Sequence, residues 1–221
     1  MPKIQAPDLF LASASPRRKL LLQQCGLTFK VIKTKTDESM VSGEKPEDMV
    51  LRLSNQKATQ ALNTLTENRL YETSTLVVIG SDTTVCVEKT DILGKPESVK
   101  EAYKMLSKIS GKKHSVYTAY TILERSPLKK KGETQFMYYA LSKVVETKVT
   151  IKRLSRREIA SYIKTKEPMD KAGAYAAQGM GMSFIEKIEG SYTNVVGLPM
   201  KELVEDLELE FNVLPYWRLK S

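Results

Sequence analysis

The chain has 221 residues, of which 41% are hydrophobic and 28% charged, and its formal net charge is +9. This composition is typical of a globular protein with one sizeable core, and no apolar run is long enough to span a membrane. The N-terminus lacks the apolar segment of a secretory signal, so we expect one cytoplasmic domain over residues 1–221, away from any membrane.

The sequence predicts alternating strands and helices. In chain order we expect a strand at residues 9–12, a helix from 16 to 26, a strand at 29–32, a helix from 46 to 65, strands at 76–79 and 84–87, a helix from 98 to 111, a strand at 114–123, an exposed loop at 124–136, a strand at 138–151, a helix from 155 to 165, a strand at 182–188 and a helix from 199 to 209. This alternation indicates an α/β fold, but it does not give the order of the strands.

Three serines mark helix starts. Ser15 precedes a proline at the first helical position, which is a common arrangement at an N-cap. Ser98 and Ser155 are each followed three residues later by glutamate, which predicts two capping boxes.

Soft metal ligands are few. Cys25, Cys86 and the single histidine, His114, amount to three at most, which argues against a structural zinc site and a disulfide framework. No Gly-x-Ser-x-Gly motif is present to hold a nucleophilic serine. If the protein uses a metal, we expect a hard cation held by carboxylates and phosphates.

An anion-binding site is one interpretation of residues 12–18, Ala-Ser-Ala-Ser-Pro-Arg-Arg. Small serines and the free N–H groups of a helix start let a phosphate approach, and arginine can clamp it with two hydrogen bonds. The helix dipole disfavours arginine at this end, so Arg17 and Arg18 are easier to explain if an anion binds. A capped helix with two solvated arginines is an equally good interpretation.

Several charged residues lie where strands end. Asp82 follows the most apolar strand, at the edge where α/β proteins form ligand clefts, and it could hold a metal or act as a general base. An aspartate that caps a turn is the alternative. Lys95, between glycine and proline, is outside any Walker A loop and by itself reads as a surface turn. Glu38 and Lys57 read equally well as solvated residues.

Taken together, these segments resemble the Maf family of the Maf/inosine-triphosphatase-like pyrophosphatases. The resemblance rests on an ordered set of motifs: Leu-Ala-Ser-Ala-Ser-Pro-Arg-Arg at 11–18, Gly-Ser-Asp-Thr at 80–83, Leu-Gly-Lys-Pro at 93–96, Ser-Gly-Lys-Lys-His-Ser-Val-Tyr-Thr at 110–118, Glu-Pro-Met-Asp-Lys-Ala-Gly-Ala-Tyr at 167–175 and Leu-Pro at 198–199. The order is that of the family and covers nearly the whole chain. Residues 124–136 are longer than the family leads us to expect, which predicts a surface-loop insertion.

The resemblance implies a mixed twisted sheet with flanking helices and two lobes around a central cleft, in a homodimer. It also implies cleavage of nucleoside triphosphates to the monophosphate and pyrophosphate with Mg²⁺ or Mn²⁺. Asp82 matches the catalytic position, and Glu38 joins it as a metal ligand. Positions that match phosphate-binding residues are Ser13, Ser15, Arg18, Lys57 and Lys95.

Three positions match residues that sort substrates in the family, and here they are Arg17, Thr83 and Gln178. The set resembles the dTTP/UTP subfamily, and the Gln178 amide carries the donor and acceptor that match a uracil or thymine edge. Two alternatives stay open: a Maf protein that acts on 7-methyl-GTP or another modified nucleotide, and a nucleic-acid-binding or division-regulating protein that uses the basic surface. Nucleic-acid binding is the less expected, because Asp82, Lys95 and Glu38 are all present.

Overall fold

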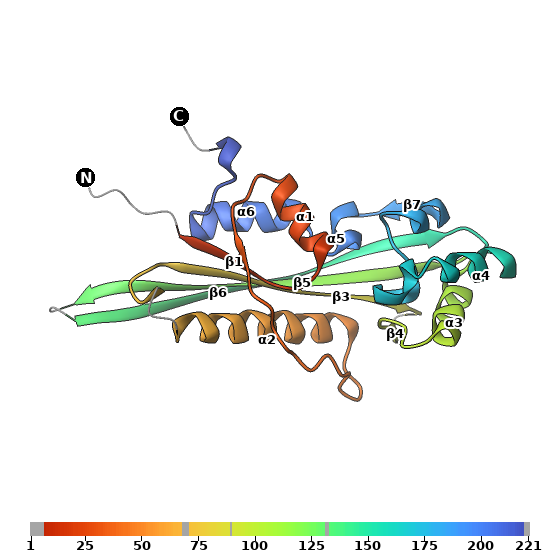
Figure 1. The fold of residues 1–221 in the computed structure, drawn as a ribbon, viewed down its shortest axis with the longest axis horizontal. Coiled ribbons are helices and arrows are strands. Elements are labelled where there is room, and N and C mark those ends of the chain that lie inside the picture. Colours follow the sequence, from red (N-terminus) through yellow and green to blue (C-terminus); the bar gives the residue numbers. More distant parts are fainter. Residues whose placement is uncertain (1–6, 68–70, 89, 131–132, 219–221) are drawn as a thin grey trace.

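The structure is a computed structural model that describes residues 7–67, 71–88, 90–130 and 133–218. It contains a seven-stranded mixed sheet with helices on both faces (Figure 1). The strands are β1 (Asp8–Ala12), β2 (Lys30–Val31), β3 (Leu76–Val87), β4 (Asp91–Leu93), β5 (Lys113–Lys130), β6 (Glu133–Ile151) and β7 (Ile185–Glu189). The helices are α1 (Pro16–Gln24), α2 (Pro46–Thr66), α3 (Val99–Ile109), α4 (Arg156–Lys164), α5 (Tyr192–Val196) and α6 (Met200–Phe211). Shorter 3₁₀ segments are η2 (Glu167–Asp170), η3 (Ala172–Ala174), η4 (Met180–Phe184) and η5 (Tyr216–Arg218). The predicted α/β class is confirmed.

The strand order is β2-β1-β3-β5-β6-β7. β1 runs parallel to β2 and β3, whereas the pairs β3–β5, β5–β6 and β6–β7 are antiparallel. β4 pairs with β3 on the same edge as β1 but further along the strand. Because two short strands, β1 and β4, share this edge of β3, a gap remains between them.

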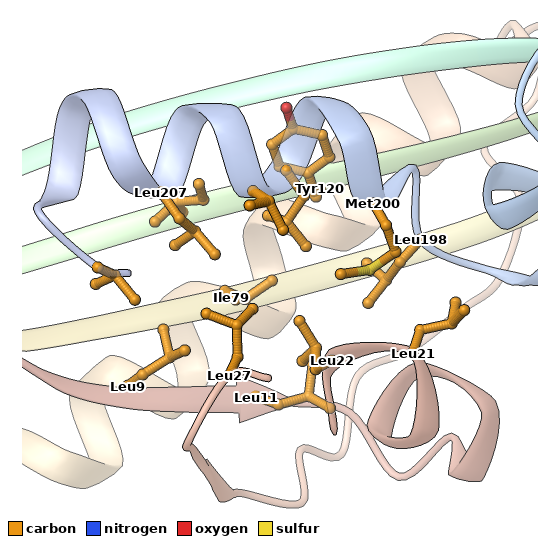
Figure 2. Close-up of a cluster of buried hydrophobic side chains, with 14 of the residues drawn as sticks. Leu9, Leu11, Leu21, Leu22, Leu27, Ile79, Tyr120, Leu198, Met200 and Leu207 are labelled. Carbon is orange, nitrogen blue, oxygen red and sulfur yellow. The ribbon is translucent and has the colours of Figure 1, made fainter. Parts of the chain in front are cut away.

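The side chains of β3 alternate between two helical layers. Val77 and Ile79 face the layer of α1 and α6, where they join a core with Leu22 and Leu207 (Figure 2). Leu76 and Val78 face α2 and pack with Ala58, Ala61 and Leu62. Because side chains alternate along a strand, odd-numbered residues of β3 point to α1 and α6, and even-numbered residues point to α2.

A second core builds the other lobe. The far end of β3 packs with α3 and α4 through Val85, Leu106, Ile109 and Ile159, all of which are buried. Figure 1 shows α3 and α4 together at one end of the molecule, away from α2 and α6. None of the helices in the described ranges is long and apolar enough to cross a membrane.

The helix starts follow the predicted serines. The Ser15 side chain accepts a hydrogen bond from the Arg18 N–H, with Pro16 at the first helical position. Ser155 and Glu158 form the full capping box. The box at Ser98 is only half correct, because the Glu101 carboxylate accepts from the N–H of Glu97 instead.

The exposed loop predicted at residues 124–136 is wrong. β5 and β6 continue as a paired hairpin to Lys130 and Glu133, and this hairpin projects beyond the rest of the sheet (Figure 1). Pro127 is tolerated because hydrogen bonding alternates along an antiparallel strand, and its nitrogen faces the side of β3. The pairing of β3 with β5 stops at Leu76 and Arg125, so no ladder bond is lost there. Within the stretch predicted as a loop, residues 131 and 132 lie outside the described residues.

Other boundaries also differ. Residues 76–87 form one continuous strand, because β5 pairs with them throughout. The strand predicted at 182–188 begins only at Ile185, after η4. β4 and α5 were missed because each is very short, and both depend on contacts with distant segments.

A candidate active site at a gap in the sheet edge

The candidate site lies where the edge of β3 is open. β1 pairs with β3 as far as Ala12, opposite Gly80, and β4 pairs with β3 from Val85 onward. Within the described residues, no strand therefore covers positions 81–84 on this edge. A cavity of about 1000 Å³ opens at this gap. Seven basic and five acidic side chains line it, a surplus that suits an anionic ligand: Arg17, Arg18, Lys57, Lys95, Lys104, Lys108 and Lys171, with Glu38, Asp82, Glu97, Glu101 and Asp170.

A chain of ion pairs crosses the α2 side of the cavity. Lys57 Nζ lies 2.6 Å from Asp82 Oδ1 and 2.6 Å from Glu38 Oε1. Lys95 Nζ lies 3.2 Å from the other oxygen of Glu38. The Lys57 and Asp82 side chains are buried, whereas Glu38 and Lys95 are exposed. Lysines and carboxylates therefore alternate across the site, and four of the predicted residues come together from four segments.

Glu38 is held in its ionised form. Burial by itself would raise the pKa of Glu38, but the hydrogen bond and charge of Lys57, followed by those of Lys95, lower it to about 2. The carboxylate therefore carries its negative charge throughout the neutral range.

Two carboxylates are a suitable donor set for a hard cation. Mg²⁺ is commonly bound through one or two carboxylates together with substrate phosphates. Glu38 and Asp82 share Lys57 as a partner, which places their oxygens around one point. Within the described ranges no group of three or more His, Cys, Asp or Glu side chains is arranged to hold a metal, and this site supplies two carboxylates. The pair fits a divalent cation that takes further oxygen ligands from a bound phosphate.

Arg18 is built into the wall of the site. Its side chain is buried, with Nε donating to the carbonyl of Gly197 at 2.9 Å and Nη1 donating to the carbonyl of Ser81 at 2.8 Å. Further bonds reach Ser13 Oγ at 3.3 Å and Thr83 Oγ1 at 3.0 Å. Arg18 thus bonds to the Ser81 carbonyl, which a longer β1 would cover. Most of the N–H groups of Arg18 are engaged within the protein. This arrangement supports a positioning role, and direct contact with phosphate stays a prediction.

The neighbouring residues of this segment are also partnered. Ser13 Oγ accepts from the N–H of Ser15, and Ser15 Oγ caps α1. Arg17 Nη1 lies 3.3 Å from Asp170 Oδ2, at the mouth of the cavity. The structure pairs Lys57, Lys95 and Arg17 with carboxylates. A bound anion therefore has to compete with these carboxylates for the cations.

Gln178 lies on a loop that is fixed at both ends. The Glu167 carboxylate accepts from the N–H groups of Met180 and Gly181, at 3.0 and 2.9 Å, and from the Tyr162 hydroxyl at 2.8 Å. The same hydroxyl accepts from the N–H of Ala176. Burial would raise the pKa of Glu167, but the backbone hydrogen bonds lower it. Tyr162 and Glu167 thus present the half-buried Gln178 to the cavity.

Most of the chain is similar to known proteins. Residues 8–210 match the family described as Maf-like protein. The chain belongs to the Maf family. It is 43% identical over 200 residues to a dTTP/UTP pyrophosphatase of Syntrophus aciditrophicus (strain SB), covering 90% of this chain and 88% of the relative. It is 45% identical over 195 residues to a dTTP/UTP pyrophosphatase of Caldicellulosiruptor bescii, covering 88% and 90%. A Thermoanaerobacter sp. (strain X514) protein of the same name is 44% identical over 206 residues, covering 93% and 97%.

All ten site residues expected from the Maf resemblance line this one cavity: Ser13, Ser15, Arg17, Arg18, Glu38, Lys57, Asp82, Thr83, Lys95 and Gln178. Their individual roles stay predictions. Sequence reasoning missed Glu167 and Tyr162, which hold the Gln178 loop, and Thr118, which bonds to Thr83. Thr118 and Glu167 lie within motifs that carried the resemblance, but nothing in their spacing indicated their partners.

Proposed function

We propose that this Maf-family chain hydrolyses dTTP and UTP to the nucleoside monophosphate and pyrophosphate. The observation that carries the proposal is the pairing of both Asp82 and Glu38 with Lys57 at the open edge of β3. Its relatives, 42–45% identical over most of the chain, are dTTP/UTP pyrophosphatases.

In this proposal Asp82 accepts the proton of the attacking water. The anhydride bond between the α- and β-phosphates breaks, and pyrophosphate leaves. Glu38 and Asp82 would hold the divalent metal, which supplies positive charge to the phosphate oxygens when it is bound. Lys57 and Lys95 stabilise the remaining negative charge of the leaving pyrophosphate, so positioning and charge stabilisation account for most of the catalysis.

The cavity wall positions the nucleotide. Arg18 holds the carbonyls of Ser81 and Gly197, and so keeps β3 and the α5–α6 turn at a fixed separation. Thr83 meets Arg18, whereas its neighbour Asp82 meets Lys57, so Thr83 faces another side of the cavity. Thr83 and Gln178 line the cavity and carry neutral polar groups. These groups suit a nucleobase better than a triphosphate, and we assign the base to this side.

A nucleotide panel tests the proposal. We expect pyrophosphate and monophosphate from dTTP and UTP in the presence of Mg²⁺ or Mn²⁺, followed by ³¹P NMR, and no turnover after chelation. Release of orthophosphate and a diphosphate would show that a different bond is cut. Faster turnover of 7-methyl-GTP would assign the chain to the other subfamily. Absence of turnover combined with tight, salt-dependent DNA binding would favour the nucleic-acid-binding alternative.

We also propose that the chain forms a homodimer. The outer edge of β6 pairs with β7 over residues 148–151, and no other described strand covers residues 133–147 of that edge. Met137, Tyr138 and Tyr139 on this edge strand are exposed. Open edges with apolar side chains are usually covered by another chain. Light scattering at micromolar concentration tests this, since a monomeric mass contradicts it.

A further inference from the structure

The cavity has two chemically different sides because β3 alternates. Asp82 is even-numbered and points to α2, where it meets Lys57. Thr83 is odd-numbered and points to α1 and α5, where it meets Arg18. Two adjacent residues thus face two different sides of one cavity, Asp82 the side of Lys57 and Thr83 the side of Arg18.

The Thr83 hydroxyl belongs to a line of hydrogen bonds. Arg18 Nη2 donates to Thr83 Oγ1 at 3.0 Å. Thr83 Oγ1 lies 2.9 Å from Thr118 Oγ1, and Thr118 Oγ1 donates to the main-chain carbonyl of Asn194 at 2.9 Å. Thr118 and Asn194 are fully buried.

The direction of every bond in this line is determined. A guanidinium only donates and a carbonyl only accepts, whereas a hydroxyl has one hydrogen to give. Thr118 gives its hydrogen to the Asn194 carbonyl, so Thr83 must give its own hydrogen to Thr118. The Thr83 oxygen also accepts from Arg18, and what remains is one lone pair. Thr83 can therefore only accept a hydrogen bond from a ligand.

The acceptor of this line is itself fixed in place. The side-chain amide of Asn194 donates to the carbonyl of Val116 at 3.1 Å and to Thr147 Oγ1 at 2.9 Å. These bonds tie α5 to both β5 and β6. The Asn194 carbonyl therefore cannot turn away to let the Thr118 hydrogen point elsewhere.

Gln178 by itself cannot distinguish uracil from cytosine. Its amide offers a donor and an acceptor, and a half-turn of the amide exchanges them. One orientation donates to O4 of uracil, and the other accepts from the amino group of cytosine at the same position, which leaves the ring N3 to be distinguished by another group. A second group of fixed polarity is needed to select between the two bases.

We propose that Thr118 and the Asn194 carbonyl act as positioning groups that make Thr83 an obligate acceptor, and that Thr83 thereby selects a base with a ring N–H, such as uracil or thymine, against cytosine. The inference rests on the proposed function and deepens it. Cytosine would place the lone pair of N3 against the lone pair of Thr83, and a buried polar mismatch of this kind discriminates strongly.

The test compares Thr118→Val with Thr118→Ser. Valine has the shape of threonine but cannot accept the Thr83 hydrogen, which becomes free to point to the ligand. We expect the wild-type ratio of kcat/KM for UTP over CTP to be about 10² or more, and to fall at least about tenfold in Thr118→Val. Serine keeps the hydroxyl, and Thr118→Ser should restore the wild-type ratio.

Thr121→Val is the matched control. Thr121 is also fully buried on β5 and bonded to two hydroxyls, those of Ser54 and Ser142. Neither of these partners lines the cavity, whereas Thr83, the partner of Thr118, does. Thr121→Val should lower Tm without changing the UTP:CTP ratio. An unchanged ratio in Thr118→Val, or an equal change in Thr121→Val, overturns the inference.

Dissociation constants of UMP and CMP, measured by calorimetry on the same four proteins, separate the two proposals. If no nucleotide is hydrolysed, the proposed function fails. The UMP:CMP preference and its loss in Thr118→Val still decide the role of Thr83, and equal affinity of the wild-type protein for the two ligands rejects that role.

Discussion

Lys57 and Asp82 face each other at 2.6 Å because Gly80 lets their two elements approach. A β-carbon on Gly80 would lie 2.2 Å from the carbonyl oxygen of Ser54 and 2.6 Å from the nitrogen of Ala58, both in the backbone of α2. Lys57 directly precedes Ala58 in α2 and reaches across to Asp82. The close approach of α2 to β3 therefore sets the geometry of the site.

Asp82→Asn tests the proton acceptor. Asparagine can still accept from Lys57, and Lys57 keeps Glu38 as a partner, so we expect the variant to fold. Loss of a general base should lower kcat by roughly 10²–10⁴-fold. Asp48→Asn, an exposed residue in the first turn of α2, is the control and should stay near wild type. Activity of Asp82→Asn within a factor of two of wild type would remove Asp82 from the mechanism.

Gly80→Ala tests the approach of α2. The added methyl group meets rigid backbone, and overpacking of this kind costs about 1–3 kcal/mol. We expect a lower Tm together with a lower kcat, because α2 must shift and carry Lys57 away from Asp82. At Gly94 a β-carbon would meet nothing within 4 Å, so Gly94→Ala should leave Tm unchanged. A Gly80→Ala protein with unchanged Tm and kcat would show that the close contact is dispensable.

Gln178→Glu tests base recognition. An ionised carboxylate only accepts hydrogen bonds, so O4 of uracil or thymine would face it without a donor. We expect kcat/KM for UTP and dTTP to drop steeply, whereas guanine nucleotides, which offer N1–H and N2–H donors, should lose less. The ratio of kcat/KM for UTP to that for GTP is the measurement. If this ratio is the same in both proteins, Gln178 does not contact the base.

His114 predicts a dependence of stability on pH. Burial lowers the pKa of this residue, the single histidine of the chain, to about 4, and its Nε2 lies 2.9 Å from the Tyr175 hydroxyl. Between about pH 6.5 and pH 4 the unfolded chain binds a proton that the folded chain does not. The contribution of His114 to stability is therefore complete above about pH 6.5 and decreases as the pH falls, by on the order of 3 kcal/mol in total.

Urea unfolding at pH 7, 6 and 5 measures this effect. His114→Gln retains a polar side chain but does not titrate, so the loss of unfolding free energy between pH 7 and 5 should be smaller in the variant. Equal losses in the two proteins, or an NMR titration of the His114 ring near pH 6.5 in the folded protein, would disprove the assignment.

The local elements could be predicted because their signals lie within a few adjacent residues. Ser15 and Pro16 start α1, Ser155 and Glu158 start α4, and the apolar run at 76–79 lies in the centre of the sheet. The hairpin at 124–136 could not be predicted. Pro127 and the lysines that follow it are typical of a loop. A strand can hold Pro127 because β3 stops pairing with β5 at Arg125, before Pro127.

The order of the motifs along the chain identifies the family, and the motifs also indicate which residue types meet in the site. How those residues contact one another depends on the three-dimensional fold. Arg18 bonds to the Ser81 carbonyl because β1 stops pairing with β3 before it reaches Ser81. Thr83 is an acceptor because its hydrogen is given to Thr118, which in turn donates to the Asn194 carbonyl. Such polarities depend on hydrogen bonds between segments up to 179 residues apart, which no local pattern encodes.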